Sequence, residues 1–168
     1  MSPAKTCGAC NFCCKVLEIA ELAKPAGVWC PHANPGKGCA IHGSHPASCQ
    51  AFACQWLIDP GMPDAFRPDR SKVVLRMDAE ARRITADCEA ANPMAWRREP
   101  MFGLLKENAR RGWSQGYLVF AKVGQRMWLI APGEELDLGE VPPGAPLAVQ
   151  RDAGGRLSVR VGPASAEQ

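Results

Sequence analysis

The chain has 168 residues, the length of one ordinary domain, with nine cysteines and a formal net charge of +3. Its 46% hydrophobic and 22% charged residues exclude a disordered chain and a coiled coil. The longest apolar runs, such as residues 127–131, have the length of a strand, whereas a membrane helix needs about 18 apolar residues. We therefore expect a globular chain with no membrane segment.

The cysteines are concentrated at the N-terminal end, where residues 1–58 hold all of them except Cys88. The opening residues contain no apolar secretory core, which favours a cytoplasmic location. In a reducing compartment, dense cysteines bind metals more often than they form disulfides. The odd number of cysteines and the adjacent pair Cys13 and Cys14 also suit a disulfide framework poorly. We therefore expect residues 1–58 to form a loop-rich segment organised by metal.

The candidate ligands begin with two overlapping C-x-x-C units that are followed directly by another cysteine. A C-x-x-C turn brings two sulfurs to one cation, and Gly8 leaves this turn free to adopt a positive φ. Eight thiolates complete two four-thiolate sites, and adjacent cysteines point in different directions, which suits two metals. The predicted metal ligands are Cys7, Cys10, Cys13, Cys14, Cys30, Cys39, Cys49 and Cys54.

Zinc and iron compete for such thiolates. The repeated C-x-x-C units and the two complete ligand sets favour two Zn²⁺ ions. The C-x-x-C-x-x-C run with a remote Cys30-Pro31 is typical of iron–sulfur ligation, so iron or an iron–sulfur cluster is the alternative cofactor. His32, His42 and His45 could each replace a cysteine, although eight thiols favour positions outside the ligand sphere. The spacing does not assign the ligands to the two sites.

Few regular elements are expected among these cysteines. Residues 15–24 have apolar residues at helical spacing up to Pro25, although a short strand at 16–19 followed by a helical turn fits equally well. Residues 34–38 have turn chemistry, and residues 48–58 predict a helix that Ser48 would cap. Since so little of this segment can form an apolar core, metal should supply much of its folding free energy.

The cysteine motifs resemble those of the bacterial CxxCxxCC zinc- or iron-chelating domain family over about residues 7–57. The family usually has Arg-Pro before its seventh cysteine, where this chain has His45-Pro46. The resemblance implies metal chelation by the cysteines. It does not extend to the lysine methylase activity of some relatives, because this chain shows no Gly-rich cofactor loop. The motifs that carry it are Cys7-x-x-Cys10-x-x-Cys13-Cys14, Trp29-Cys30-Pro31-His32, Gly38-Cys39-Ala40-Ile41-His42, Pro46-Ala47-Ser48-Cys49 and Phe52-Ala53-Cys54-Gln55-Trp56-Leu57.

Residues 59–168 are predicted to form a small α+β unit packed against the cysteine segment. The two parts form either two domains or a single domain. A Pro/Gly/Asp-rich connection leads into the α+β unit, and Cys88 is expected in its core. The carboxylates Glu134, Glu135 and Asp137 are expected in a turn. The predicted elements are a hairpin of strands 72–78 and 83–89, a mainly helical stretch 93–113 that restarts at Pro100, and strand pairs 117–123 with 125–130 and 147–151 with 157–161.

The functional prediction is a metal-binding cysteine-cluster protein with a structural or adaptor role, and an iron–sulfur redox protein or enzyme is the alternative. No acid–base pair or nucleophile motif appears, so no catalytic residue is predicted and the question of enzymatic activity stays open. A protein partner would dock on the C-terminal unit. Nucleic acid is weakly supported, because the net charge counts the thiols as neutral and exposed hairpin charges explain the scattered arginines equally well. These arginines are Arg67, Arg70, Arg76, Arg82 and Arg83.

Overall fold

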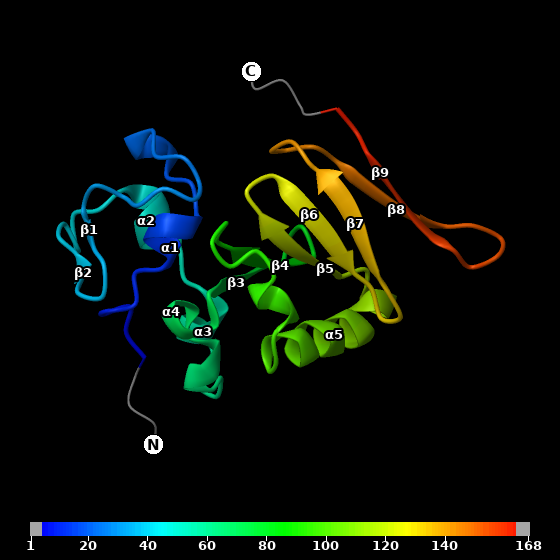
Figure 1. Ribbon diagram of the computed structural model, residues 1–168, viewed down its shortest axis with the longest axis horizontal. Helices are drawn as coiled ribbons and strands as arrows, with labels where there is room; N and C mark the ends of the chain where they lie inside the picture. The colour runs from blue at the N-terminus through cyan, green and yellow to red at the C-terminus, as the bar shows by residue number, and fades with distance from the viewer. Residues whose placement is uncertain (1–4, 164–168) are drawn as a thin grey trace.

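The computed structural model describes residues 5–163, and the predicted mixed α+β fold is confirmed (Figure 1). The helical elements are α1 (Cys13–Val16), η1 (Ala20–Leu22), α2 (Ala47–Ala51), α3 (Gln55–Ile58), η2 (Asp64–Phe66), α4 (Pro68–Ser71), η3 (Ala95–Arg97), α5 (Met101–Gly112) and η4 (Trp113–Gln115), where η marks a 3-10 turn. The strands are β1 (Ala33–Asn34), β2 (Gly38–Cys39), β3 (Val73–Asp78), β4 (Arg83–Cys88), β5 (Leu118–Val123), β6 (Arg126–Ile130), β7 (Glu135–Glu140), β8 (Leu147–Arg151) and β9 (Leu157–Val161).

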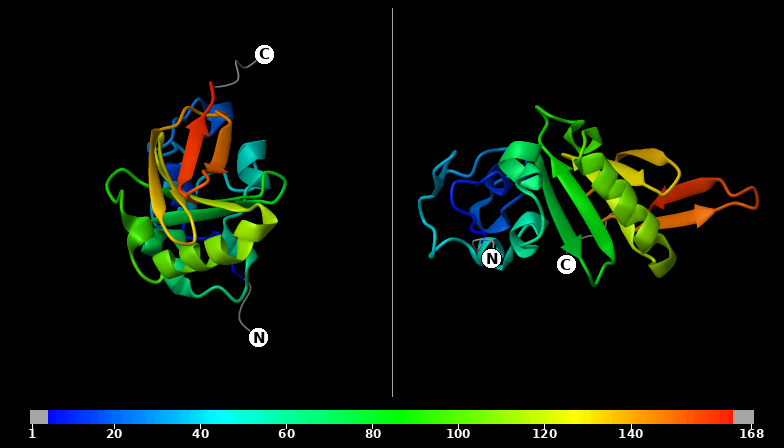
Figure 2. Two further views of the ribbon diagram at one scale, coloured as in Figure 1. Left: turned by 90° about the vertical axis from the view of Figure 1, so that its right-hand side faces the viewer. Right: turned by 90° about the horizontal axis from the view of Figure 1, so that it is seen from below.

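A five-stranded sheet in the order β3-β4-β5-β6-β7 forms the centre of the molecule. All neighbouring strands are antiparallel except β4 and β5, which run parallel. Parallel neighbours need a crossover connection, and here it contains α5, which lies across one face of the sheet (Figure 2). The three predicted strand pairs are confirmed, and the structure joins two of them into this one sheet.

Strand β7 corrects the prediction that Glu135 and Asp137 belong to a turn. Leu136 and Leu138 alternate with these carboxylates and pack against the core, while Asp137 stays exposed and binds Arg126 at 2.6 Å. This period-2 alternation is the signal that predicts a strand. The turn prediction was wrong because it relied on the acidic residues and not on the leucines between them.

Each face of the sheet has its own apolar core. The face under α5 packs around Trp96 and Leu105, which are both fully buried. The opposite face packs Phe120 and Leu129 against the β8–β9 hairpin and the loop before it. Cys88 lies in the first core and is 3% exposed, so its predicted core position is confirmed. Burial raises the pKa of the Cys88 thiol to about 12, which keeps it protonated at neutral pH.

Helix α5 begins after Pro100, as predicted, whereas the stretch before it contains only the turn η3. Met101, Leu105 and Ala109 are buried at the i, i+4, i+8 positions that one helix face presents to a sheet. At 12 residues α5 is the longest helix. Among residues 5–163, no helix combines the length and the apolar character needed to cross a bilayer.

Replacing Gly112 by alanine should destabilise the protein. A Cβ at this position would lie 2.7 Å from the Cβ of Tyr117, whose backbone N–H is held by a hydrogen bond of 3.0 Å to the Gly112 carbonyl oxygen. We expect the overpacking cost of about 1–3 kcal/mol to exceed the helix-propensity gain of at most about 1 kcal/mol. Urea unfolding measures the difference. The matched control is Gly103→Ala in the same helix, where the Cβ meets only the mobile carboxylate of Glu99, so this variant should be neutral or stabilising.

The cysteine segment forms a separate lobe of short elements beside β3 (Figure 1). The continuous helix considered for residues 15–24 is wrong, and the alternative of an extended stretch followed by a helical turn is closer. The chain is extended at Leu17 and Ile19, and the backbone of Ile19 pairs with that of Lys24 around η1. The apolar residues of 15–24 therefore lie in a tight loop and do not form one face of a helix.

The predicted helix 48–58 is also wrong, because it divides into α2 and α3 at residues 52–54. Ser48 lies in the first turn of α2, and its side chain does not cap that helix. Instead the carboxylate of Glu21 accepts hydrogen bonds from the Ser48 backbone N–H at 2.9 Å and the Ser48 hydroxyl at 2.7 Å. Cys54 becomes the N-cap residue of α3 with an extended backbone. The break therefore places Cys54 at the N-terminus of α3.

Candidate metal centre

All eight cysteines predicted as ligands line one cavity of about 870 Å³, and Cys88 of β4 also borders it. The eight lie in the loop before α1, in α1, in the loop before β1, in β2, in α2 and at the N-cap of α3. Every cysteine in the chain is a free thiol. Among residues 5–163, no three cysteine, histidine or carboxylate side chains converge as a group that could hold a metal ion. The predicted donors therefore surround one cavity, but they are spread along its wall and do not converge on one point.

Three of the thiols contact one another around Cys13. The Cys13 thiol is hydrogen-bonded to those of Cys14 and Cys7. These hydrogen bonds lower the pKa of Cys7 to about 6 and that of Cys14 to about 7. The same contacts, with burial, raise the pKa of Cys13 well above its usual range. These contacts thus favour the thiolate form of Cys7 and Cys14, and thiolates are what a soft metal binds.

A buried cation lies beside a second group of thiols. Lys24 is only 3% exposed, and its ammonium donates to the carbonyl oxygens of Lys15, at 3.1 Å, and Leu17. Burial lowers the pKa of Lys24, and nearby cysteines act in the opposite direction. The sequence analysis placed Lys24 at the end of the stretch 15–24 and assigned it no role in the centre. The cysteines close enough to act on its charge are Cys30, Cys14, Cys13 and Cys49.

Cys54 occupies a position that supplies hydrogen-bond donors to its sulfur. Burial raises its pKa, and the backbone N–H groups of Leu57 and Trp56 in the first turn of α3 oppose that effect. Backbone N–H donors of this kind orient thiolate ligands and stabilise their charge. Trp56 also lines the cavity, and its buried indole nitrogen has no hydrogen-bond partner in residues 5–163. The break between α2 and α3 therefore creates a site suited to a thiolate.

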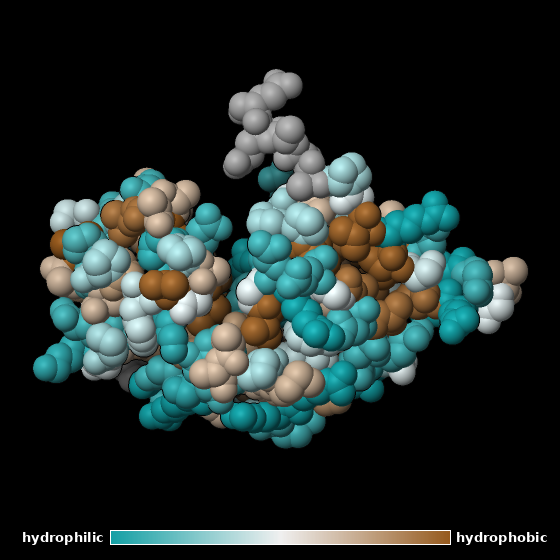
Figure 3. All heavy atoms as spheres, turned by 45° about the horizontal axis from the view of Figure 1, so that its top comes forward, coloured by the Kyte–Doolittle hydropathy of each residue, from teal (hydrophilic) through white to brown (hydrophobic). Residues whose placement is uncertain are grey.

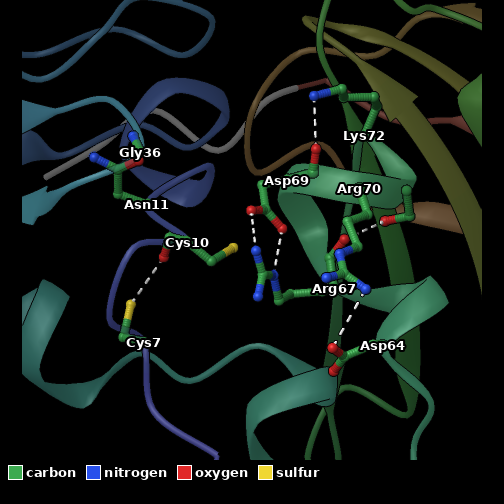
Figure 4. Close-up of polar contacts among 10 residues, drawn as sticks. Cys7, Cys10, Asn11, Gly36, Asp64, Arg67, Asp69, Arg70 and Lys72 are labelled. Carbon is green, nitrogen blue, oxygen red and sulfur yellow. Dashed lines mark hydrogen bonds and ion pairs between the residues drawn. The ribbon is translucent and has the colours of Figure 1, made fainter.

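Cys10 lies between the opening turn and α4 (Figure 4). Its carbonyl oxygen accepts a hydrogen bond from the Cys7 thiol at 3.2 Å. Burial raises the pKa of Cys10 to about 11, against the effect of the backbone N–H groups of Phe12 and Asp69. The Asp69 carboxylate is held by two hydrogen bonds of 2.6 Å from Arg67, which lower its pKa. A charged pair that the sequence analysis did not assign to the centre thus flanks this thiol.

Close backbone approach brings the opening turn against the β1–β2 hairpin. Gly8 adopts the predicted positive φ of 40°, and a Cβ on Gly38, whose φ is 113°, would lie 3.0 Å from the Gly8 carbonyl oxygen. The side chain of Asn11 is 4% exposed and donates to the carbonyl oxygens of Asn34 at 2.9 Å and Gly38 at 3.2 Å. Cys39 follows Gly38 directly, so these contacts place its thiol at the same cavity as Cys7 and Cys10.

The three histidines also line the cavity. The rings of His42 and His45 stack with their centroids 5.0 Å apart, and His45 accepts a hydrogen bond from the Gly43 backbone N–H at 3.0 Å. The charge of His42 is close enough to help lower the pKa of Cys7. His45 therefore orders its own loop through these two contacts.

The five arginines considered for nucleic-acid binding lie in different parts of the structure. Arg67 and Arg70 bind Asp69 and Asp64 beside α4, and Arg82 donates to the backbone of Gln115. Arg76 and Arg83 line a common cavity. The five side chains therefore do not form one basic surface, which agrees with the weak support that the sequence gives to nucleic-acid binding.

Among known proteins, no family, curated protein or solved structure matches this chain.

Proposed function

We propose that the protein is a cytoplasmic metal-binding protein whose cysteine lobe holds two Zn²⁺ ions in thiolate sites and has a structural or adaptor role. The observation that carries this proposal is the collection of eight thiols, from three short elements and the loops between them, around one cavity. Soft thiolates are the donors that zinc prefers, and closed four-thiolate sites organise short segments without taking part in hydrolysis. The resemblance to the CxxCxxCC family implies the same chemistry.

Charge and hydrogen bonding support two sites. A four-thiolate Zn²⁺ site carries a net charge of about −2, which a buried cation and backbone N–H groups offset. Lys24 would supply that cation to the cysteines around it, and the start of α3 would supply N–H groups to Cys54. Cys13 and Cys14 are adjacent, and their contacts extend toward both groups of thiols. When bound, the zinc would crosslink the loops and neutralise thiolate charge.

Elemental analysis of protein purified without air tests the proposal. We expect about two zinc ions per chain and a colourless solution, as two four-thiolate sites require. Cys13→Ser should lower the zinc content, because it removes the thiol that contacts two others. Cys88→Ser is the control, since Cys88 borders the same cavity but is buried in the core of the sheet and is not a predicted ligand, and it should retain the full zinc content. Equal loss of zinc from both variants would contradict the assignment.

An iron–sulfur redox protein is the second candidate, favoured by the C-x-x-C-x-x-C run with Cys30-Pro31. The optical spectrum of the same preparation separates the two candidates. Visible thiolate-to-iron charge-transfer bands that bleach reversibly on reduction would support iron and exclude zinc as the native metal. A colourless, zinc-containing protein would exclude the iron–sulfur candidate.

A further inference from the structure

A second cavity, of about 720 Å³, lies beside the cysteine lobe on the face of the sheet opposite α5. One wall is formed by residues 51–53 and Ile58 of the cysteine lobe, and the other by residues 141–146 and Leu147 at the start of β8. Figure 3 shows the molecule hollowed between its two main bodies. The volume is that of a typical small-molecule site. We refer to this cavity as the sheet cleft.

The floor of the sheet cleft is polar because alternate residues of three strands point to the same face. Arg76 of β3 is paired in register with Thr85 of β4, and Lys122 of β5 is paired with Asp87. The residues between them, such as Leu75 and Ala86, are buried on the opposite face against the α5 core. The strand register therefore places the polar side chains together.

The cations of this floor differ in their partners. Arg76 is bound to the buried carboxylate of Asp87 by hydrogen bonds of 2.6 and 3.3 Å. Arg83 lies over the ring of Phe120, 5.3 Å from its centroid, and makes no ion pair with any residue in 5–163. Lys122 likewise has neither an ion pair nor a side-chain hydrogen bond within that range. Two half-buried cations thus face one cavity without an ion pair, and with Arg76 they outnumber the neighbouring carboxylates of Asp78 and Asp87, which favours an anion between them.

A neutral hydrogen-bonding group completes the floor. Thr85 is only 5% exposed and lines the sheet cleft. A threonine hydroxyl can donate a hydrogen bond to an oxygen of a ligand in the cleft. Asp78, at the mouth of the cleft, accepts a hydrogen bond from the Ala81 backbone N–H at 2.9 Å and is exposed. The anion would lie deeper, near Thr85.

We infer that the sheet cleft binds a small organic anion, with its phosphate or carboxylate group held by Arg83, Lys122 and the Thr85 hydroxyl. Guanidinium and ammonium groups bind both kinds of oxyanion through charge-assisted hydrogen bonds. Arg76 and Lys122 also line the cysteine cavity, so the remainder of the ligand would extend toward the thiols. The inference rests on the floor of the cleft and is independent of the metal that the cysteines bind.

NMR titration of the full-length, zinc-loaded chain tests this inference, with inorganic phosphate and succinate as probes at fixed ionic strength. We expect saturable shifts of the amides of β4 and β5 around Thr85 and Lys122. Stronger binding of phosphate would identify a phosphate ester as the ligand class, and stronger binding of succinate would identify a carboxylate. If neither probe gives a saturable shift, the inference is wrong. The inference is also wrong if a short single-stranded RNA shifts these amides whereas neither phosphate nor succinate does.

Substitutions of residues in the floor of the sheet cleft provide a second test of the inference. Arg83→Gln/Lys122→Gln should raise the dissociation constant at least about tenfold, since each lost charge-assisted contact costs about that factor. Thr85→Val should weaken binding severalfold, and Arg83→Lys should retain most of it. The control Arg156→Gln/Arg160→Gln removes the same charge from exposed positions of the β8–β9 hairpin and should bind as the wild type does. Equal losses in both double variants would show binding to overall charge and overturn the inference, whatever the zinc content.

Discussion

Removing the metal with a chelator under reducing conditions should abolish amide protection throughout residues 10–57 and leave that of the five-stranded sheet intact. The longest helix of this segment, α2, has 5 residues, and strands β1 and β2 have 2 residues each. Isolated helices shorter than about 12–15 residues are marginal in water. The elements of the cysteine lobe therefore cannot persist unless its loops are crosslinked.

The apolar core of this lobe is too small to replace the metal. Its buried apolar residues are Cys10, Phe12, Val16, Ile19, Cys30 and Trp56, and the first three pack with Val74 of strand β3. In contrast, the sheet carries two independent cores, one on each face. In zinc-finger peptides the metal supplies about 10–16 kcal/mol, whereas six buried side chains at about 1.5–3 kcal/mol each must already offset the conformational entropy of this segment. Loss of metal should therefore unfold the lobe and expose the outer end of β3.

Hydrogen exchange with mass spectrometry measures both halves of this prediction in one experiment. The control is the same chelator saturated with zinc beforehand, which should leave exchange in residues 10–57 unchanged. Unchanged protection of that segment after complete metal removal would refute a structural role for the metal. Simultaneous loss of protection in strands β4 to β6 would refute the independence of the sheet.

Local pairing in the C-terminal unit could be predicted from the sequence, but long-range pairing could not. Alternating apolar residues on both sides of Gly124 predict the β5–β6 hairpin, and Gly124 adopts the positive φ of 59° that such a turn uses. The parallel pairing of β4 with β5 depends on a connection of nearly 30 residues through α5. Periodicity describes which face of a strand is apolar and does not specify its distant neighbour.

In the cysteine lobe, residue type was more informative than periodicity. The eight thiols line one cavity, as expected for ligands of neighbouring metals. The two helices considered there fail because tertiary hydrogen bonds, such as those of Glu21 with Ser48, replace helix continuation. Lys24 and Lys122 were not predicted as parts of any site, since a lysine that faces thiols or a cleft has the same local sequence pattern as an exposed one. Their roles become visible only when distant segments pack together.

Trp96→Ala should be among the most destabilising single substitutions in the sheet. Trp96 is fully buried, with its ring centroid 5.7 Å from that of Trp128 and 6.1 Å from that of Phe102. It lies between β4 and α5, so truncation leaves a cavity at the centre of the core on that face. Large-to-small changes of this kind cost about 3–5 kcal/mol. Urea unfolding of the zinc-loaded protein, followed by far-ultraviolet circular dichroism, measures the loss.

Trp96→Phe separates the packing of the aromatic ring from the effect of the buried indole nitrogen. The indole nitrogen of Trp96 is buried and has no hydrogen-bond partner in residues 5–163, so its removal sacrifices no hydrogen bond and relieves an unsatisfied donor. The phenylalanine ring retains most of the aromatic contacts with Trp128, and we expect a cost of roughly 1–2 kcal/mol. If Trp96→Phe costs as much as Trp96→Ala, the indole nitrogen has a partner such as a buried water, and packing alone does not account for the stability that Trp96 provides.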